Sequence, residues 1–157
     1  MTQHRPRRPG ESRAAAAPRS ALRDTAALYA AVAAGSMIGG VLRALASLAL
    51  ADRLESGFPW ATLFVNVTGS FAIGVYAALS GPDGRLSVGP RQRHFVMTGI
   101  CGGYTTFSAF SLETLRLLQA GHLSAAGLNI CASVAGSLAA VWLGHALAVR
   151  CNRLKGS

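Results

Sequence analysis

The stretch FVMTGICGGYTTFSAFSL, residues 95–112, contains no acidic or basic side chain. It also contains no proline, the residue that interrupts helices. Its length reaches the roughly 18 residues that an α-helix needs to cross the hydrocarbon core of a bilayer. The stretch therefore predicts a membrane-spanning helix.

Three more stretches of the chain have the same character. Residues 25–51 carry Arg43 as their one charge, residues 60–80 carry none, and in residues 123–149 only His145 can ionise. The prolines all lie outside these stretches, at positions 6, 9, 18, 59, 82 and 90. Within lipid, backbone polar groups must be bonded inside their own segment, which favours helices. We therefore predict an all-α integral membrane protein with four transmembrane helices, which form one domain over residues 25–150.

The composition of the whole chain supports this class. Of its 157 residues, 51% are apolar and 13% are charged, whereas a soluble domain carries about 25% charged residues. Six of the 15 Lys and Arg residues fall in residues 1–24, which hold few large apolar groups. Such a segment cannot bury enough surface to fold alone. We expect residues 1–24 to be a disordered basic tail and residues 151–157 to be a short basic C-terminal tail.

The positive charges are unevenly divided between the two ends of the predicted bundle. The N-terminal tail, the loop with Arg85, Arg91 and Arg93, and the C-terminus share one side and carry twelve Lys and Arg residues. The other side carries Arg53 and Arg116. Because Lys and Arg accumulate on the cytoplasmic side, we expect a multi-pass protein of the cell membrane with both termini in the cytoplasm.

A double glycine, Gly102–Gly103, lies near the middle of the opening stretch, and Tyr104-Thr105-Thr106 follows it. Such a run forms helix poorly and releases backbone carbonyls. Irregular backbone at membrane depth is tolerated where it lines a cavity, is buried in protein or binds an ion. The third helix is therefore predicted to be broken at its centre. Elsewhere, the four-residue spacing of Gly35/Gly39 and of Gly99/Gly103 predicts close packing between helices.

The polar side chains inside the predicted spans can donate hydrogen bonds, and none is acidic. They include Arg43, Asn66, Thr105, Thr106, Ser108, Ser111, Asn129, Ser133 and Ser137. An interior of donors with one positive charge suits an anion better than a cation. A hydroxyl in a membrane helix also often bonds a carbonyl of its own helix, so each hydroxyl has two interpretations. Phe107 and Phe110 share a helix face and can present their positive ring edges to an anion, or can simply be core.

Three motifs in these spans resemble the CrcB/Fluc family of fluoride channels. GICGGYTTFSAFSLE at 99–113 resembles the family signature GxxGGxTTFSTF. TLFVNVTGSFAIG at 62–74 resembles GTLxxNxxGxFxxG, and GSMIGGVLR at 35–43 resembles GGxxGAxxR. The motifs occur in the family's order, one in each span.

The resemblance implies a fluoride-selective channel that passively exports cytosolic fluoride and so lowers its toxicity. The family's stacked phenylalanines match Phe107 and Phe110, its pore asparagine matches Asn66, and its vestibule arginine matches Arg43. Ser133 matches a pore-facing polar position. With these residues we place the hydroxyls of Thr106, Ser108 and Ser111 along the fluoride pathway.

The resemblance also implies an antiparallel, dual-topology dimer with pathways lined by both subunits. A structural sodium ion at the dimer centre would be held by backbone carbonyls at Gly102 and Thr105. The uneven division of positive charge argues against one sequence inserting both ways. The second subunit is therefore either an identical chain or a homologue of opposite orientation.

Other classes of protein fit the sequence less well. A small four-helix multidrug exporter needs a carboxylate inside the membrane, and only Glu113, near the end of the third span, comes close. A non-transporting scaffold does not require a polar Asn66 in the middle of a span or a broken third helix, so both features argue against this class. An enzyme is not expected, because His94 and His145 have no nucleophile or metal partner at useful spacing. The basic tail lacks any motif for nucleic acid, so we expect none as a partner.

Overall fold

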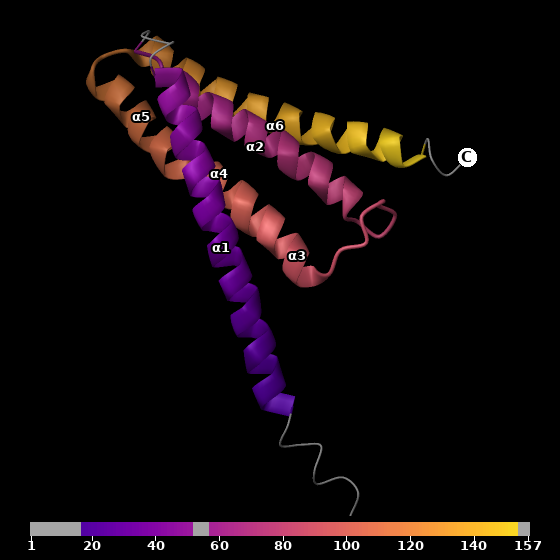
Figure 1. Cartoon of the computed structure of the whole chain (residues 1–157). Coiled ribbons are helices and arrows are strands. Elements are labelled where there is room, and N and C mark those ends of the chain that lie inside the picture. The colour runs from indigo at the N-terminus through magenta and orange to yellow at the C-terminus, as the bar shows by residue number, and fades with distance from the viewer. Residues whose placement is uncertain (1–16, 52–56, 154–157) are drawn as a thin grey trace, which may run out of the picture.

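The computed structural model describes residues 17–51 and 57–153 of the chain, and these residues form helices and no strands. The elements are α1 (Ala17–Ala51), α2 (Trp60–Leu79), α3 (Pro90–His94), the π-helix η1 (Phe95–Cys101), α4 (Gly102–Tyr104), α5 (Phe107–Gln119) and α6 (Leu123–Arg153). Figure 1 shows α2 beside α6, and α1 beside the chain of short helices that begins with α3. The all-helical prediction is confirmed for the part of the chain that the structure describes.

Among the described residues, three helical segments are long and apolar enough to cross a membrane. They are Ala21–Leu50 within α1, Trp60–Leu79, which is α2, and Leu123–Arg153, which is α6. The remaining predicted span, residues 95–112, which is the third in chain order, is divided among η1, α4 and α5, so none of its pieces is long enough alone. The prediction of apolar spanning helices is thus confirmed for three of its four stretches.

The first and last helices extend beyond the predicted domain boundaries. Helix α1 begins at Ala17, so residues 17–24 are helical and do not belong to a disordered tail. Their alanines, leucine and arginines favour helix, and Pro18 lies in the first turn, where its missing N–H is harmless. Helix α6 continues to Arg153. Residues 1–16 and 154–157, the rest of the predicted tails, lie outside the described residues.

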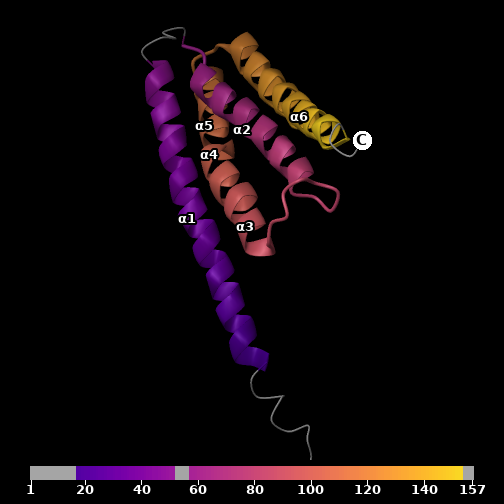
Figure 2. The same ribbon diagram turned by 45° about the vertical axis from the view of Figure 1, so that its right-hand side comes forward.

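Glycines allow α1 to lie directly against the third segment, which consists of η1, α4 and α5. A Cβ atom built on Gly35 would lie 2.9 Å from the Cα of Gly99, and one built on Gly103 would lie 2.8 Å from the Cα of Ser36. A Cβ atom on Gly39 would overlap the backbone of the same segment. The close packing predicted from the spacing of these glycines is confirmed, and it brings α1 alongside the helix break (Figure 2).

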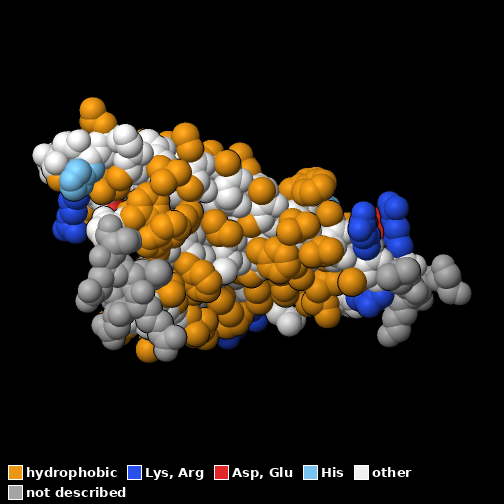
Figure 3. All heavy atoms as spheres, turned by 90° about the horizontal axis from the view of Figure 1, so that it is seen from above, with side chains coloured by type: hydrophobic (Ala, Val, Ile, Leu, Met, Phe, Trp, Pro, Cys, Tyr) orange, Lys and Arg blue, Asp and Glu red, His pale blue; other side chains and the backbone are white. Residues whose placement is uncertain are grey.

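The outer surface of the bundle is apolar, and its interior is small. Figure 3 shows apolar side chains over the middle of the visible face, with Lys and Arg at its ends. Of the large side chains that the structure describes, Val65 and Asn129 are the fully buried ones. Side chains such as Met37, Leu48 and Trp142 are about 70% exposed, with values of 68%, 68% and 70%. Such a surface is stable in lipid or against another subunit.

Candidate functional site

The third segment breaks at Thr105 and Thr106. Helix α4 ends at Tyr104, both threonines have extended backbone, and α5 begins at Phe107. The predicted break is confirmed, but it lies after the double glycine and not within it. Gly102 and Gly103 are helical, and Gly103 serves the contact with α1.

Asn66 bonds both backbone groups at the break. Its side-chain oxygen accepts a hydrogen bond from the Thr106 amide at 2.7 Å, and its Nδ2 donates to the Thr106 carbonyl at 2.9 Å. The bond to the Thr106 amide replaces the one that a continuous helix would make, whereas the Thr106 carbonyl also accepts the first bond of α5. One N–H of the Asn66 amide remains for another acceptor. The sequence pointed to Asn66 as a pathway residue and gave no sign of this role in holding the break.

Arg43 and Thr106 satisfy other groups at the same point. The Arg43 guanidinium, from α1, donates through Nη1 to the Thr105 carbonyl at 3.2 Å. The Thr106 hydroxyl accepts from the Ala109 amide at 3.2 Å and so caps α5. It also lies 3.2 Å from the Ser108 hydroxyl.

A groove of about 370 Å³ opens beside the break. Six residues predicted for the ion sites line it together: Asn66, Thr105, Thr106, Phe107, Phe110 and Ser133. Ser70, Ser137, Val134 and Leu138 complete its walls. Ser70 was not predicted, although its position one helical turn after Asn66 places it on the same face of α2. No acidic residue lines the groove.

The two predicted aromatic residues form a pair at the mouth of the groove. The ring centroids of Phe107 and Phe110 are 5.7 Å apart, and the ring planes are inclined at 45°. Phe107 is 80% exposed, whereas Phe110 is half-buried. The Phe107 ring is therefore presented outward from the subunit and is not core.

Four predicted residues do not line the groove: Arg43, Gly102, Ser108 and Ser111. Arg43 reaches the break from the side of α1. The Ser111 hydroxyl donates to the Phe107 carbonyl of its own helix at 2.9 Å, the common arrangement for a hydroxyl in a membrane helix. Ser108 and Gly102 are exposed on the surface of the subunit.

A chain of hydrogen bonds connects α6 to the helix that carries the phenylalanines. Asn129 is fully buried and donates through Nδ2 to the Thr114 hydroxyl at 2.9 Å. Thr114 donates in turn to the Phe110 carbonyl at 2.7 Å. The buried Ser133 hydroxyl lies 3.5 Å from the Asn129 side-chain oxygen. Asn129 thus holds α5 against α6, a role that its position in the sequence did not reveal.

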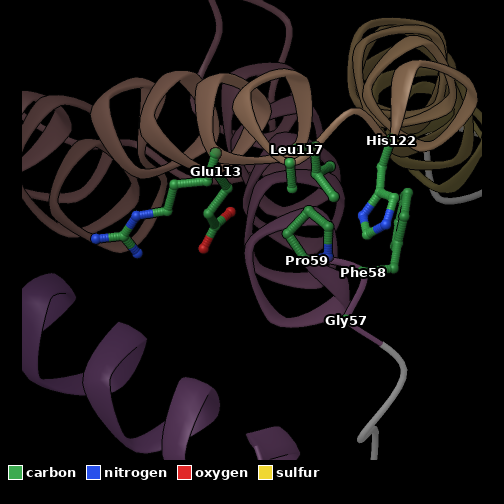
Figure 4. Close-up of a pocket in the computed structure, with 8 residues that line it drawn as sticks. Gly57, Phe58, Pro59, Glu113, Leu117 and His122 are labelled. Atoms are coloured by element: carbon green, nitrogen blue, oxygen red, sulfur yellow. The ribbon is translucent and has the colours of Figure 1, made fainter.

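Glu113 lies in the middle of α5, outside the walls of the groove. Its Oε1 accepts a hydrogen bond from the Thr62 hydroxyl at 2.9 Å. It borders a cavity of about 380 Å³ between the start of α2 and the end of α5, where Phe58, Pro59 and His122 also lie (Figure 4). The carboxylate nearest to the third span therefore holds helices together at the end of the bundle.

The backbone at the break offers carbonyl oxygens that fit a hard cation in part. Because the Thr106 amide bonds Asn66, the Gly102 carbonyl loses the helical partner four residues later. The Thr105 carbonyl accepts from Arg43 and retains a second lone pair. Unwound carbonyls of this kind coordinate cations in membrane proteins, and the described residues hold no metal-binding cluster of His, Cys, Asp or Glu. Two carbonyls are fewer than a hard cation takes, so a second copy would have to complete the site.

The fold and the groove define a small polytopic membrane protein with a donor-lined groove at a helix break. Residues 30–145 match the model of the family described as CrcB-like protein, Camphor Resistance (CrcB), and the chain belongs to this family.

Relatives of known name cover most of the chain. It is 65% identical over 136 residues to "Fluoride-specific ion channel FluC 1" of Rhodopseudomonas palustris. The aligned region covers 87% of this chain and 96% of the relative. It is 57% identical over 133 residues to "Fluoride-specific ion channel FluC 1" of Bradyrhizobium diazoefficiens, covering 85% and 92%. It is 56% identical over 125 residues to "Fluoride-specific ion channel FluC" of Paramagnetospirillum magneticum, covering 80% and 98%. The family inferred from the three motifs is confirmed.

Proposed function

We propose that this chain is a fluoride channel of the plasma membrane, which it crosses several times, and that cytosolic fluoride leaves through it passively. The observation that carries the proposal is the groove at the helix break, where Asn66 and the Phe107–Phe110 pair lie together. The names and the high identity of the relatives support the same ion. Export of fluoride lowers its toxicity to the cell.

The groove supplies the chemistry that a dehydrated anion requires. The free N–H of Asn66 and the hydroxyls of Ser70 and Ser137 are donors that replace water around the ion. The edges of the two phenylalanine rings add partial positive charge. Small residues keep the passage narrow, which disfavours a larger halide, and binding by neutral groups is weak enough to let the ion leave.

The driving force is the membrane potential. A potential that is negative inside drives an anion outward with about 2.3 kcal/mol per charge per 100 mV. No proton or cation needs to be exchanged, and the groove contains no carboxylate that would do so. This distinguishes the channel from a proton-coupled exporter, and no catalytic step is assigned to the protein.

The channel is proposed to be an antiparallel dimer in which each subunit has four spans, and η1, α4 and α5 together form the third of them. A second subunit would cover the Phe107 ring, which is 80% exposed, and the exposed Gly102. It would also complete a structural sodium site from the carbonyls of Gly102 and Thr105 in both copies. The second subunit is either an identical chain or a homologue of opposite orientation.

Ion efflux from liposomes tests the function. The purified chain alone is reconstituted into vesicles loaded with fluoride or with chloride, and release is followed with ion-selective electrodes after the potential is collapsed by a potassium ionophore. Release of fluoride without chloride is expected. Drug–proton exchange would indicate an exporter instead, and vesicles that retain fluoride both with and without a homologous subunit would contradict the proposal.

A further inference from the structure

A second cavity lies at the basic end of the bundle, apart from the groove. It has a volume of about 570 Å³ and is bordered by the end of α2, by α3 and by the end of α6. Ala77 and Ala78 of α2 and Val149 of α6 form an apolar wall, and Arg93 of α3 and Arg153 of α6 form a cationic one. The two views of the bundle place these helix ends on the same side of the molecule (Figures 1 and 2).

The charged side chains around this cavity favour an anion with one negative charge. Arg93 and Arg153 supply two positive charges, Asp83 supplies one negative charge, and His145 is the remaining ionisable group in the walls. The two arginines and the aspartate together give the walls a net charge of +1. Two more arginines, Arg85 and Arg150, lie within three residues of Asp83 and Arg153 in the sequence. Juxtamembrane arginines of this kind attract anionic phospholipids.

Asn152 gives the cavity a buried acceptor that needs a donor. Its Nδ2 donates to the Ala78 carbonyl at 3.2 Å, which fixes the orientation of the amide. Its Oδ1 is buried and finds no hydrogen-bond partner among the described residues. A buried polar atom without a partner is unusual in a folded protein. A hydroxyl or an amine on a ligand in the cavity would satisfy it.

The cavity lies where a phospholipid headgroup meets its acyl chains. Helices α2 and α6 are both long and apolar enough to span the membrane, and α2 ends at Leu79, next to Ala78 of the cavity wall. We propose that the cavity binds a phospholipid whose headgroup carries one negative charge and a free hydroxyl, the chemistry of phosphatidylglycerol. Arg93 and Arg153 hold the phosphodiester, and a headgroup hydroxyl donates to the Oδ1 atom of Asn152. The proposal does not depend on which ion the groove conducts.

Titration of the purified full chain in neutral detergent tests the proposal, with lipid binding measured by native mass spectrometry. Phosphatidylglycerol is expected to bind at least about tenfold more tightly than phosphatidylethanolamine, because only the former has net negative charge. Phosphatidylmethanol has the same charge without a hydroxyl and is expected to bind several-fold more weakly than phosphatidylglycerol. Inorganic phosphate alone is the probe for a free ion, and it is expected to give no protection against heat.

Matched variants locate the site. The double change R93Q/R153Q is expected to remove the tenfold preference, whereas R23Q/R91Q, which removes the same charge from the same end outside the cavity walls, is expected to retain it. Asn152→Leu is expected to abolish the difference between phosphatidylglycerol and phosphatidylmethanol while leaving the preference over phosphatidylethanolamine. If R93Q/R153Q does not fold, as judged by circular dichroism, R93K/R153K keeps the charges without the planar fork and is expected to bind with intermediate affinity.

Three results would each overturn the assignment. Equal losses in R93Q/R153Q and R23Q/R91Q would mean diffuse attraction to the basic end. Equal affinities for phosphatidylglycerol and phosphatidylethanolamine would mean that net charge is not recognised. Protection by inorganic phosphate equal to that by the lipid would make the cavity a site for free phosphate.

Discussion

The backbone N–H and C=O groups must be hydrogen-bonded both in the α2–α6 pair and at the junction between α4 and α5, and the two regions achieve this in different ways. In α2 and α6 the backbone bonds run inside continuous helices, and Gly74 and Gly144 let the two backbones touch. At the junction, Asn66 bonds both backbone groups of Thr106, and Arg43 bonds the Thr105 carbonyl. Side chains from neighbouring helices therefore replace regular helical bonds at the break.

The groove lies where the break meets the faces of α2 and α6 that carry Asn66, Ser70, Ser133 and Ser137. Where the backbones of α2 and α6 touch, at Gly74 and Gly144, no space remains between them for an ion. At the break, Phe107 and Phe110 line a hollow beside Asn66. The Oδ1 atom and one N–H of the Asn66 amide thus bond the backbone at the break, and the second N–H is left for the groove that Asn66 lines.

Removing the side-chain bonds at the break is expected to have the largest effect. Asn66→Leu keeps the size of the side chain but leaves the amide of Thr106 without its partner, and the Thr106 carbonyl keeps only the first helical bond of α5. At about 1–3 kcal/mol for the unpaired amide and about 0.5–1.5 kcal/mol for the lost bond to the carbonyl, the loss in free energy of unfolding is about 1.5–4.5 kcal/mol. Unfolding in a titration with dodecyl sulfate measures it.

Ser70→Ala is the control for this change, because Ser70 lines the same groove one turn later and does not bond the break. It is expected to unfold close to the wild type. A loss below about 1 kcal/mol in Asn66→Leu, the worth of one ordinary hydrogen bond, would show that the break does not need the amide.

Pushing the continuous helices α2 and α6 apart is expected to lower the stability of the protein by a smaller amount. A Cβ atom on Gly144 would overlap the backbone of Phe71, so Gly144→Ala must push α6 away from α2. Overpacking of this kind costs about 1–3 kcal/mol. Melting temperatures in detergent would show the loss.

Gly127→Ala, on the same helix, is the matched control. No atom lies within 4 Å of a Cβ atom built there, and alanine favours helix over glycine by about 0.5–1 kcal/mol. The control is therefore expected to be neutral or slightly more stable. Equal melting temperatures for the two variants would contradict the close approach of α2 and α6.

Much of this architecture is local enough to be predicted from sequence. The apolar stretches predicted the spanning helices, and the spacing of Gly35/Gly39 and Gly99/Gly103 predicted where helices touch. Of the six groove residues that were named, five lie in two short motifs, residues 62–74 and 99–113, and Ser133 was named from the resemblance to the family. These features depend on hydropathy and on spacing within one helix.

The remaining features depend on partners far away in the sequence. The break lies at Thr105–Thr106 and not at the double glycine because Asn66, forty residues earlier, competes for the Thr106 backbone. The link from Asn129 to Thr114 joins separate helices. Ser111 bonds its own helix, and the pattern of serines alone does not separate it from Ser133, which faces the groove.

The most direct test of the central claim, that fluoride passes along the groove at the break, is fluoride efflux from liposomes that contain Phe107→Ile or Phe110→Ile. Each change keeps an apolar side chain and removes the ring edge. Efflux is expected to fall at least about tenfold, or roughly 1.4 kcal/mol on the barrier to passage. Phe64→Ile, an exposed position on α2 outside the groove walls, is expected to conduct like the wild type. Wild-type efflux in both Phe107→Ile and Phe110→Ile, with the proteins folded, would contradict the account.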